Sequence, residues 1–275
     1  MLRKAAVFML GCALVSTSAL ANFENKPRIA STSLCGDSYL LALAPAQVSA
    51  LSWQSRHQLS RASAGMKALP QMWDDIEKLA ASDADVILLG PGEGGKAGPY
   101  LANTDIEVHS LVWGEDFDTV KLNVKTIGDL AGVTSQAKKL NEDISERLQI
   151  LQSRGAVRGE KPTILYLSRS GGTAGKGTYI DAAINAAGGE NIISTPGWQT
   201  LDPEMLIRLS PDVIMTSFFE GGYESVQAKS IRHAVLVEYI KARPVIDIPG
   251  SLWPCAGPDL IEAAEIIADG LDGLE

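Results

Sequence analysis

One segment of this sequence occurs twice, once in each half of the chain. The first copy runs from Asp75 to Leu88 and the second from Asp202 to Met215. In each copy a glutamate opens a short amphipathic helix, and an Asp-Val-Ile sequence further on begins an apolar run of strand length. The repeat predicts two similar α/β lobes. Because a ligand cleft between two lobes is found more often in binding proteins than in enzymes, the repeat favours a binding function.

The amino terminus has the pattern of a secretory signal peptide. Arg3 and Lys4 precede an apolar stretch at 5–15, and small residues follow as far as Ala21. We therefore expect residues 1–21 to be removed after Ala21 and the mature chain to be exported to the periplasm. The apolar run is too short to span a bilayer. Cys12 lacks a convincing lipobox, so cleavage is favoured over lipid attachment.

The charge balance limits the partners. A net charge of -9 with a pI near 4.9 argues against nucleic acid and against an anionic membrane surface, because both need a basic face. We expect a monomer whose chain is long enough for a full hydrophobic core.

The mature chain keeps two cysteines, Cys35 and Cys255, both expected in loops. Three states are open to them in an exported protein: a disulfide, which is the favoured one, two free thiols near the cleft, or a thiolate metal site. A metal site would need further ligands. The three histidines, His57, His109 and His233, fall in different elements without ligand spacing, so a site for a bare metal ion is not expected.

Short strands alternate with helices or loops in the first lobe. The expected strands are 28–32, 48–53, 86–89 and 107–113, and a helix at 37–43 is expected to be capped by Asp37. The glycine-rich run 90–98 is predicted to be a mobile loop. This alternation is typical of a parallel sheet that is covered on both faces.

Helix periodicity replaces the strands in the centre of the chain, with Thr134 or Ser135 as the cap. Apolar residues recur every three or four positions at Ala137, Leu140, Ile144, Leu148 and Leu151. The predicted organisation is a first lobe at 22–131, a linking helix at 132–156 and a second lobe at 157–275. The second lobe is expected to hold strands at 163–167, 213–216 and 245–248 and helices at 179–187 and 258–271.

Two motifs that are typical of enzymes are incomplete or absent in this sequence. The run from Ser170 to Thr178 follows a strand and precedes a helix like a phosphate-binding loop, but Ser170 replaces the first glycine and Gly177 follows the lysine. The sequence has no Gly-x-Ser-x-Gly nucleophile elbow. We therefore expect no catalysis and no cofactor, with a cleft hydrolase as the least favoured alternative.

Five motifs together carry a family resemblance: 28–43, the repeat with its two copies, 117–132 leading into the long helix, 171–179, and 252–258. In this order the chain resembles the periplasmic substrate-binding proteins of ABC importers. It is most similar to the branch for ferric siderophores, cobalamin and haem, whose lobes are joined by one long helix. The resemblance implies a metal chelate as ligand and an ABC permease in the inner membrane as partner. A sensory or scaffold module of the same fold, binding a protein or a different small ligand, is the alternative.

The resemblance also implies roles for particular residues. Such proteins dock on the permease through one acidic residue of each lobe, and the matching positions are Glu77 and Glu204. Ligands of this family lie where loops of both lobes converge at the carboxyl ends of the strands. Indole and guanidinium groups there suit a large aromatic or anionic chelate, with Arg61 as a further cation and His57 as a candidate axial ligand. The predicted ligand-binding residues are Trp53, Arg56, His57, Trp113, Arg169, Trp198 and Trp253.

Overall fold

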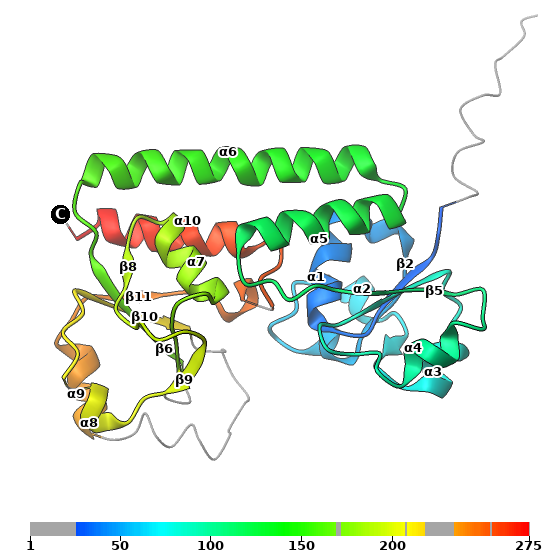
Figure 1. Ribbon diagram of the computed structural model, residues 1–275, viewed down its shortest axis with the longest axis horizontal. Coiled ribbons are helices and arrows are strands. Elements are labelled where there is room, and N and C mark those ends of the chain that lie inside the picture. Colours follow the sequence, from blue (N-terminus) through cyan, green and yellow to red (C-terminus); the bar gives the residue numbers. More distant parts are fainter. Residues whose placement is uncertain (1–25, 169–171, 207, 218–233, 254, 275) are drawn as a thin grey trace, which may run out of the picture.

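The computed structural model describes residues 26–168, 172–206, 208–217, 234–253 and 255–274. Two α/β lobes lie side by side beneath one long helix (Figure 1). The predicted signal peptide, Cys12, Arg169 and His233 lie outside the described residues.

The first lobe is built on a five-stranded parallel sheet with the order β3-β2-β1-β4-β5. Its strands are β1 (Ile29–Ser31), β2 (Val48–Ser52), β3 (Gln71–Met72), β4 (Val86–Leu89) and β5 (Glu107–Ser110). Its helices are α1 (Leu34–Leu43), α2 (Ala64–Lys67), α3 (Ile76–Ala80) and α4 (Ala97–Leu101), with 3-10 turns at Pro45–Gln47 and Trp53–Arg56.

The second lobe contains a four-stranded parallel sheet with the order β11-β10-β6-β8 and a separate antiparallel pair, β7-β9. The strands are β6 (Thr163–Ser168), β7 (Gly172–Ala174), β8 (Glu190–Asn191), β9 (Trp198–Thr200), β10 (Val213–Ser217) and β11 (Val245–Asp247). The helices are α7 (Tyr179–Ala186), α8 (Pro203–Leu206), α9 (Ala234–Lys241) and α10 (Leu260–Asp272), with a 3-10 turn at Gly250–Leu252.

The repeat predicted from the sequence is present in the topology. The order β2-β1-β4-β5 in the first lobe corresponds to β8-β6-β10-β11 in the second. The repeated aspartate has the same task in both copies: Asp85 Oδ2 accepts the Arg28 amide at 2.7 Å, and Asp212 Oδ2 accepts the Thr163 amide at 2.8 Å. Each aspartate thus fixes the start of its lobe's first strand. The predicted fold class, two similar parallel-sheet lobes with a long connecting helix, is confirmed.

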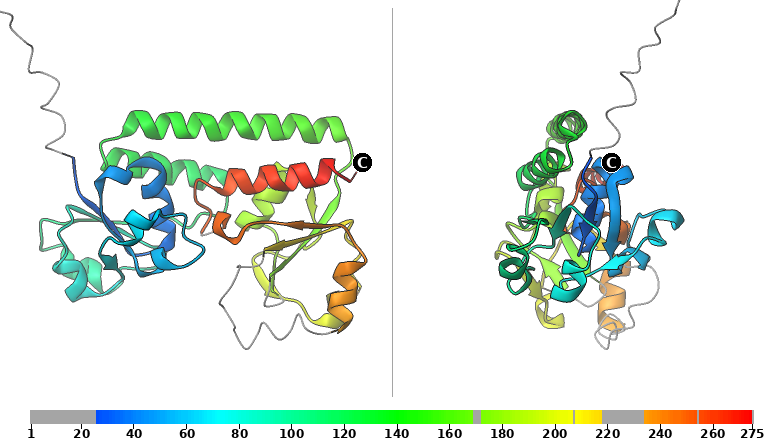
Figure 2. Two further views of the ribbon diagram at one scale, coloured as in Figure 1. Left: turned by 180° about the vertical axis from the view of Figure 1, so that it is seen from behind. Right: turned by 90° about the vertical axis from the view of Figure 1, so that its right-hand side faces the viewer.

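The long helix α6 spans Thr134–Arg158, 25 residues, which corresponds to about 37 Å. It extends beyond the predicted end at residue 156. The prediction of a side-chain cap was wrong, because Val133 occupies the cap position and Thr134 instead donates to Asp129 at 3.2 Å. Helix α5 (Phe117–Leu130) packs along α6 over the first lobe, and α10 packs along it over the second (Figures 1 and 2).

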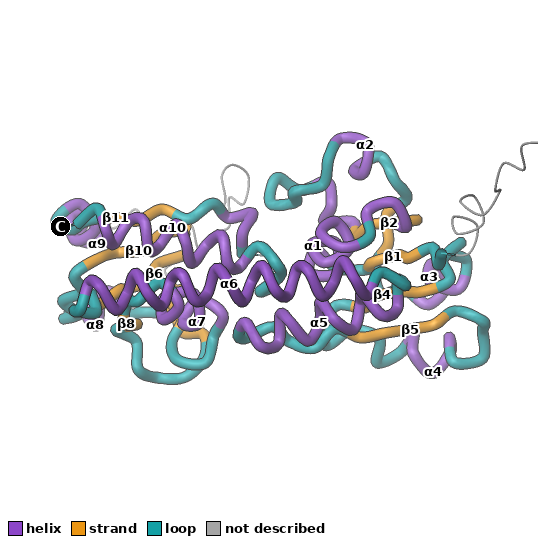
Figure 3. The backbone as a smooth tube through the Cα atoms, turned by 90° about the horizontal axis from the view of Figure 1, so that it is seen from above, coloured by secondary structure: helices purple, strands orange, loops and turns teal. Residues whose placement is uncertain are grey.

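Successive residues of the central strands point to opposite faces of each sheet, and the two faces belong to different hydrophobic cores. Ile29 and Val86 of the first lobe and Ile164 and Val213 of the second belong to one continuous cluster with α1, α5, α6, α7 and α10. The opposite faces of the two sheets have separate small cores. Seen from above, α6 crosses both lobes over this shared layer (Figure 3). The lobes are therefore joined through a common apolar core as well as through the chain.

Two details of α1 differ from prediction. The helix begins at Leu34 because Ser33 caps it, accepting the Gly36 amide at 3.2 Å, so Asp37 is a buried helical residue and not the cap. Cys35 accordingly lies in a helix and not in a loop. Part of the predicted glycine-rich loop is also helical, since α4 begins at Ala97.

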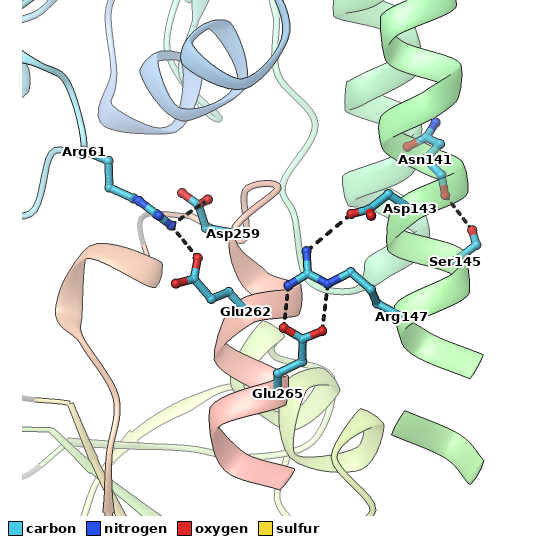
Figure 4. A network of polar contacts seen from close by, with 8 residues as sticks. All are labelled: Arg61, Asn141, Asp143, Ser145, Arg147, Asp259, Glu262 and Glu265. Carbon is cyan, nitrogen blue, oxygen red and sulfur yellow. Dashed lines mark hydrogen bonds and ion pairs between the residues drawn. The ribbon is translucent and has the colours of Figure 1, made fainter. Parts of the chain in front are cut away.

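Ion pairs run between α6 and α10. Arg147 holds Glu265 with two hydrogen bonds of 2.7 and 2.5 Å (Figure 4), and Arg154 binds Asp269 and Asp272 one and two turns further along. These pairs lie on the solvent side of the shared core. They hold the second lobe's last helix in register with α6.

A second junction joins the first lobe to the segment before α10. Cys35 and Cys255 form a disulfide with their Cα atoms 5.2 Å apart, and Tyr39 donates to the Ala256 carbonyl at 3.0 Å. Cys255 and Ala256 have left-handed φ values of 51° and 37°, which are uncommon for residues other than glycine. Gly114 passes so close that a Cβ there would lie 2.8 Å from the Ala256 oxygen.

Candidate ligand-binding site

Four aromatic rings gather at one place in the second lobe: Tyr166, Tyr179, Trp198 and Trp253, here called the aromatic cluster. Trp198 lies 5.3 Å from Tyr179 and 6.4 Å from Tyr166 between ring centroids. Trp253 lies 6.0 and 6.4 Å from the same two tyrosines. These separations are typical of tilted and edge-to-face packing. The two tyrosines thus hold the two tryptophans in fixed positions.

The rings come from separate elements. Tyr166 lies in β6, Tyr179 is the first residue of α7, and Trp198 opens β9 opposite Ala174 of β7. Trp253 follows the turn Gly250–Leu252. Trp253 is 4% exposed, whereas Trp198 is 51% exposed. Trp198 therefore exposes about half of its indole to solvent, and Trp253 supports the cluster from inside.

Two buried polar atoms adjoin Tyr179. Trp253 Nε1 and Glu115 Oε2 have no hydrogen-bond partner among the described residues. Burial raises the pKa of the Glu115 carboxyl, and a hydrogen bond from the Tyr179 backbone opposes the shift. An unsatisfied buried polar group costs about 1–3 kcal/mol, so a hydrogen-bonding partner for either atom would be stabilising.

The cluster's phenols remain neutral near neutral pH. Burial raises the pKa of Tyr166 to about 12, and burial also raises the pKa of Tyr179. Both rings can therefore donate hydrogen bonds and offer apolar faces, but neither presents a phenolate in this arrangement.

The first lobe contributes exposed side chains after β2 and β5. Trp53 is 53% exposed at the start of a 3-10 turn, and Trp113 is 61% exposed after β5. Arg56 is exposed, and its Nε donates to the Lys67 carbonyl at 3.3 Å. His57 is partly buried, and its Nδ1 accepts the Leu59 amide at 3.2 Å. All four follow carboxyl ends of parallel strands, as expected for a binding edge.

The turn that carries Trp53 is fixed from several directions. Asp37 binds Ser52, the residue before it, and the Gln54 side chain accepts the Leu34 amide at 3.1 Å. Gln71 donates to the Trp53 carbonyl at 3.0 Å. The Trp53 indole is therefore exposed on a backbone that is held in place.

Arg61, considered from sequence as a cation for the ligand, is engaged elsewhere. Its guanidinium pairs with Asp259 at 2.9 Å and with Glu262 at 2.7 Å (Figure 4). This pairing ties a loop of the first lobe to the start of α10. Arg61 is thus part of the junction between the lobes.

Sequence reasoning missed Tyr166, Tyr179 and Glu115. Tyr179 ends the segment 171–179 that carried part of the family resemblance, so that segment could have pointed to it. Tyr166 lies inside an apolar strand, where its sequence context is that of an ordinary core residue. Glu115 stands in a connection between β5 and α5 without any motif.

Glu77 and Glu204 occupy equivalent positions in the two lobes. Each is exposed and is the second residue of a short helix preceded by an aspartate. Asp75 accepts the Lys78 amide at 2.9 Å, and Asp202 accepts the Glu204 amide at 2.9 Å. The repeat therefore places one exposed carboxylate on each lobe, at the second residue of a short helix.

Metal-ligating side chains do not gather in groups of three or more within the described ranges. Burial lowers the pKa of His109, which lies in β5 away from the aromatic cluster's elements. Among the residues that the structure describes, no helix has the length and apolar character that are needed to cross a membrane.

The fold is that of a two-lobed α/β protein whose lobes are joined by one long helix. The sequence profile of the family described as periplasmic binding protein matches residues 29–249. The chain belongs to this family.

Similar proteins agree with this assignment. An uncharacterised ABC transporter substrate-binding lipoprotein, YvrC of Bacillus subtilis, is 23% identical over 72% of this chain and 65% of its own length. A cobalamin-binding protein of Halobacterium salinarum is 28% identical over 52% of this chain and 40% of its own length. The matches thus span less than two thirds of these relatives.

Among solved structures, the periplasmic haem-binding protein HutB of Vibrio cholerae superposes with a TM-score of 0.72. The superposition covers 89% of this chain and 98% of that one, at 20% identity. At this identity the likeness shows a shared fold.

Proposed function

We propose that this protein is a periplasmic receptor that binds a metal chelate of the tetrapyrrole type, haem or a corrinoid, and delivers it to an ABC permease. The aromatic cluster carries the proposal. A half-exposed indole on Trp198, backed by two tyrosines and a buried tryptophan, matches the flat apolar face of a macrocycle. The haem- and cobalamin-binding relatives support the same ligand class.

The first lobe supplies complementary groups. Trp53 and Trp113 are large apolar side chains that remain exposed, and exposed aromatic groups at a loop edge favour a binding role. Arg56 offers a cation for carboxylates at the rim of a macrocycle, and Arg169 is proposed for the same task. His57 is the proposed axial contact to the metal. A ferric siderophore is the alternative chelate, since a catecholate would also stack on indole.

Tryptophan fluorescence of the mature chain, titrated with haemin, cobalamin and a panel of ferric siderophores, tests the ligand. Saturable quenching by one tetrapyrrole with a Kd of about 1 μM or tighter is expected. Saturation by a siderophore alone would overturn the tetrapyrrole proposal. No response to any chelate would favour the sensory or scaffold module.

The permease partner is tested separately. We propose that Glu77 and Glu204 pair with cationic side chains of the permease, one on each lobe. Charge reversal at both, Glu77→Lys with Glu204→Lys, should abolish uptake of the chelate in cells while the affinity of the purified receptor for it stays unchanged. Unchanged uptake would contradict docking through these residues.

A further inference from the structure

A groove of about 630 Å³ lies on the outer side of the first lobe, next to Glu77. Elements β2, β3 and α3 form it. We call it the β3 groove and define it by Gln71, Trp73, Glu77, Lys78, Ser49 and Ser82. Ala50 and Met72, both buried, also line it, so its floor is apolar. None of the aromatic cluster or the proposed ligand residues lines the groove, although Gln71 of the groove donates to the Trp53 carbonyl.

The groove has backbone and hydroxyl groups without partners. Strand β3 lies at the edge of its sheet, and in the described ranges it pairs only with β2, with Gln71 opposite Leu51. An unpaired strand edge is a template for an added extended segment. The buried hydroxyls Ser49 Oγ and Ser82 Oγ likewise have no hydrogen-bond partner among described residues.

The rim of the groove favours a cation. Trp73 is 41% exposed, and Lys78 Nζ lies 3.9 Å from the centroid of its ring, so this indole already holds a positive charge. Glu77 and Asp75 are exposed carboxylates on the same groove. An arginine suits such a rim, because its planar guanidinium can stack on indole while it pairs with a carboxylate.

The second lobe has no matching edge strand in the described part of its four-stranded sheet. Its sheet ends at β8, the strand that corresponds to β2, and nothing equivalent to β3 lies beyond it. Glu204 therefore repeats Glu77 without a strand added to the edge of the main sheet, because β9, which precedes α8 as β3 precedes α3, pairs with β7 instead. The two docking carboxylates differ in what surrounds them.

We infer that the β3 groove receives an extended extracytoplasmic segment of the permease that carries an arginine. The segment lies along β3, and its guanidinium pairs with Glu77 and stacks on Trp73 in place of Lys78. This inference rests on the proposed docking role of Glu77. It adds that the first lobe recognises a strand-like segment, whereas the second lobe offers a carboxylate without such an edge strand.

The test measures association of the chelate-loaded receptor with its permease in lipid nanodiscs. Trp73→Ala should raise the Kd for the permease about tenfold, the scale of a desolvated cation–π contact, while Trp73→Phe should raise it only about twofold. Tyr100→Ala is the matched control, because Tyr100 is 57% exposed on α4 of the same lobe and does not line the groove. The affinity of all three variants for the chelate should remain that of the wild type.

The outcomes separate the inference from the docking proposal. If Glu77→Lys prevents association and Trp73→Ala does not weaken it, the docking role of Glu77 is retained and the inference that the β3 groove binds the permease is overturned. If neither change weakens association, both are overturned. A photo-crosslinking residue at position 73 should also attach to a permease segment that contains arginine, and attachment to a segment without arginine or lysine would contradict the proposed occupant.

Discussion

Asp37, in the middle of α1, accepts two hydrogen bonds from Ser52 at the end of β2, one from the amide at 2.9 Å and one from the hydroxyl at 2.6 Å. Neither residue is exposed to solvent. Ser52 directly precedes Trp53. The carboxyl thus connects the first helix to the turn that presents a proposed ligand residue.

This relationship predicts a pH dependence of stability. Burial raises the pKa of Asp37 from 3.8 to about 6, and the hydrogen bonds from Ser52 oppose the shift. Between these two values the folded chain retains a proton that the unfolded chain has released. The contribution to stability is therefore complete below pH 3.8 and is lost as the pH rises towards about 6.

Asp37→Asn removes the titration. The free energy of unfolding of the wild type, taken relative to Asp37→Asn, should increase by up to about 3 kcal/mol as the pH falls from 7 to 4. Chemical denaturation at several pH values measures it. A difference that is independent of pH, or that moves in the opposite direction, would show the prediction to be wrong.

The disulfide between Cys35 and Cys255 should stabilise the whole chain. It joins residues 220 positions apart, and a cross-link over a long loop restricts the unfolded chain strongly. Replacing both cysteines by serine in the mature chain should cost about 2–4 kcal/mol of unfolding free energy. Reduction of the disulfide in the wild type should lower its melting temperature to about that of the double variant. The same reductant should leave the melting temperature of the double variant unchanged.

Trp198→Ala should weaken chelate binding by about tenfold or more, because the exposed indole loses its stacking contact with the ligand. Trp198→Phe should lose less, since a phenyl ring retains part of the face. Trp73→Ala is the matched control, since Trp73 is also about half exposed but lies outside the aromatic cluster. Calorimetric titration with haemin and cobalamin measures the affinities. Equal affinities for Trp198→Ala and the wild type would remove Trp198 from the site.

Ligand binding should produce only a small hinge motion. The shared core and the two-bonded pair between Arg147 and Glu265 hold both lobes against α6. Small-angle scattering of free and chelate-bound receptor should give radii of gyration that differ by less than about 1 Å. A change typical of large domain closure would contradict this expectation.

The sequence predicted the architecture because the repeat carries it. The Asp-Val-Ile segments begin β4 and β10, which occupy corresponding positions in the two sheets. Element boundaries were less predictable: α1 starts at Leu34 because Ser33 caps it, and β3 consists of two residues, too short for a periodic pattern.

The candidate site was predicted only in part. The tryptophans stood out because they follow strands, but which of them meet depends on contacts between distant elements. Tyr166 and Tyr179 join Trp198 and Trp253 through three-dimensional packing that no local pattern encodes. The same packing makes Trp253 a buried support, although its sequence context resembled that of the exposed indoles.

The core that continues beneath α6 from one lobe to the other has a consequence for folding. Two duplicated lobes with separate cores could unfold one at a time, but here Ile29 of the first strand and Ile164 of the sixth belong to the same cluster. Loss of packing in either half exposes apolar surface in both. Amide hydrogens in the central strands of the two sheets should therefore exchange with solvent through one opening event, so that the receptor has a single cooperative folding unit despite its duplicated plan.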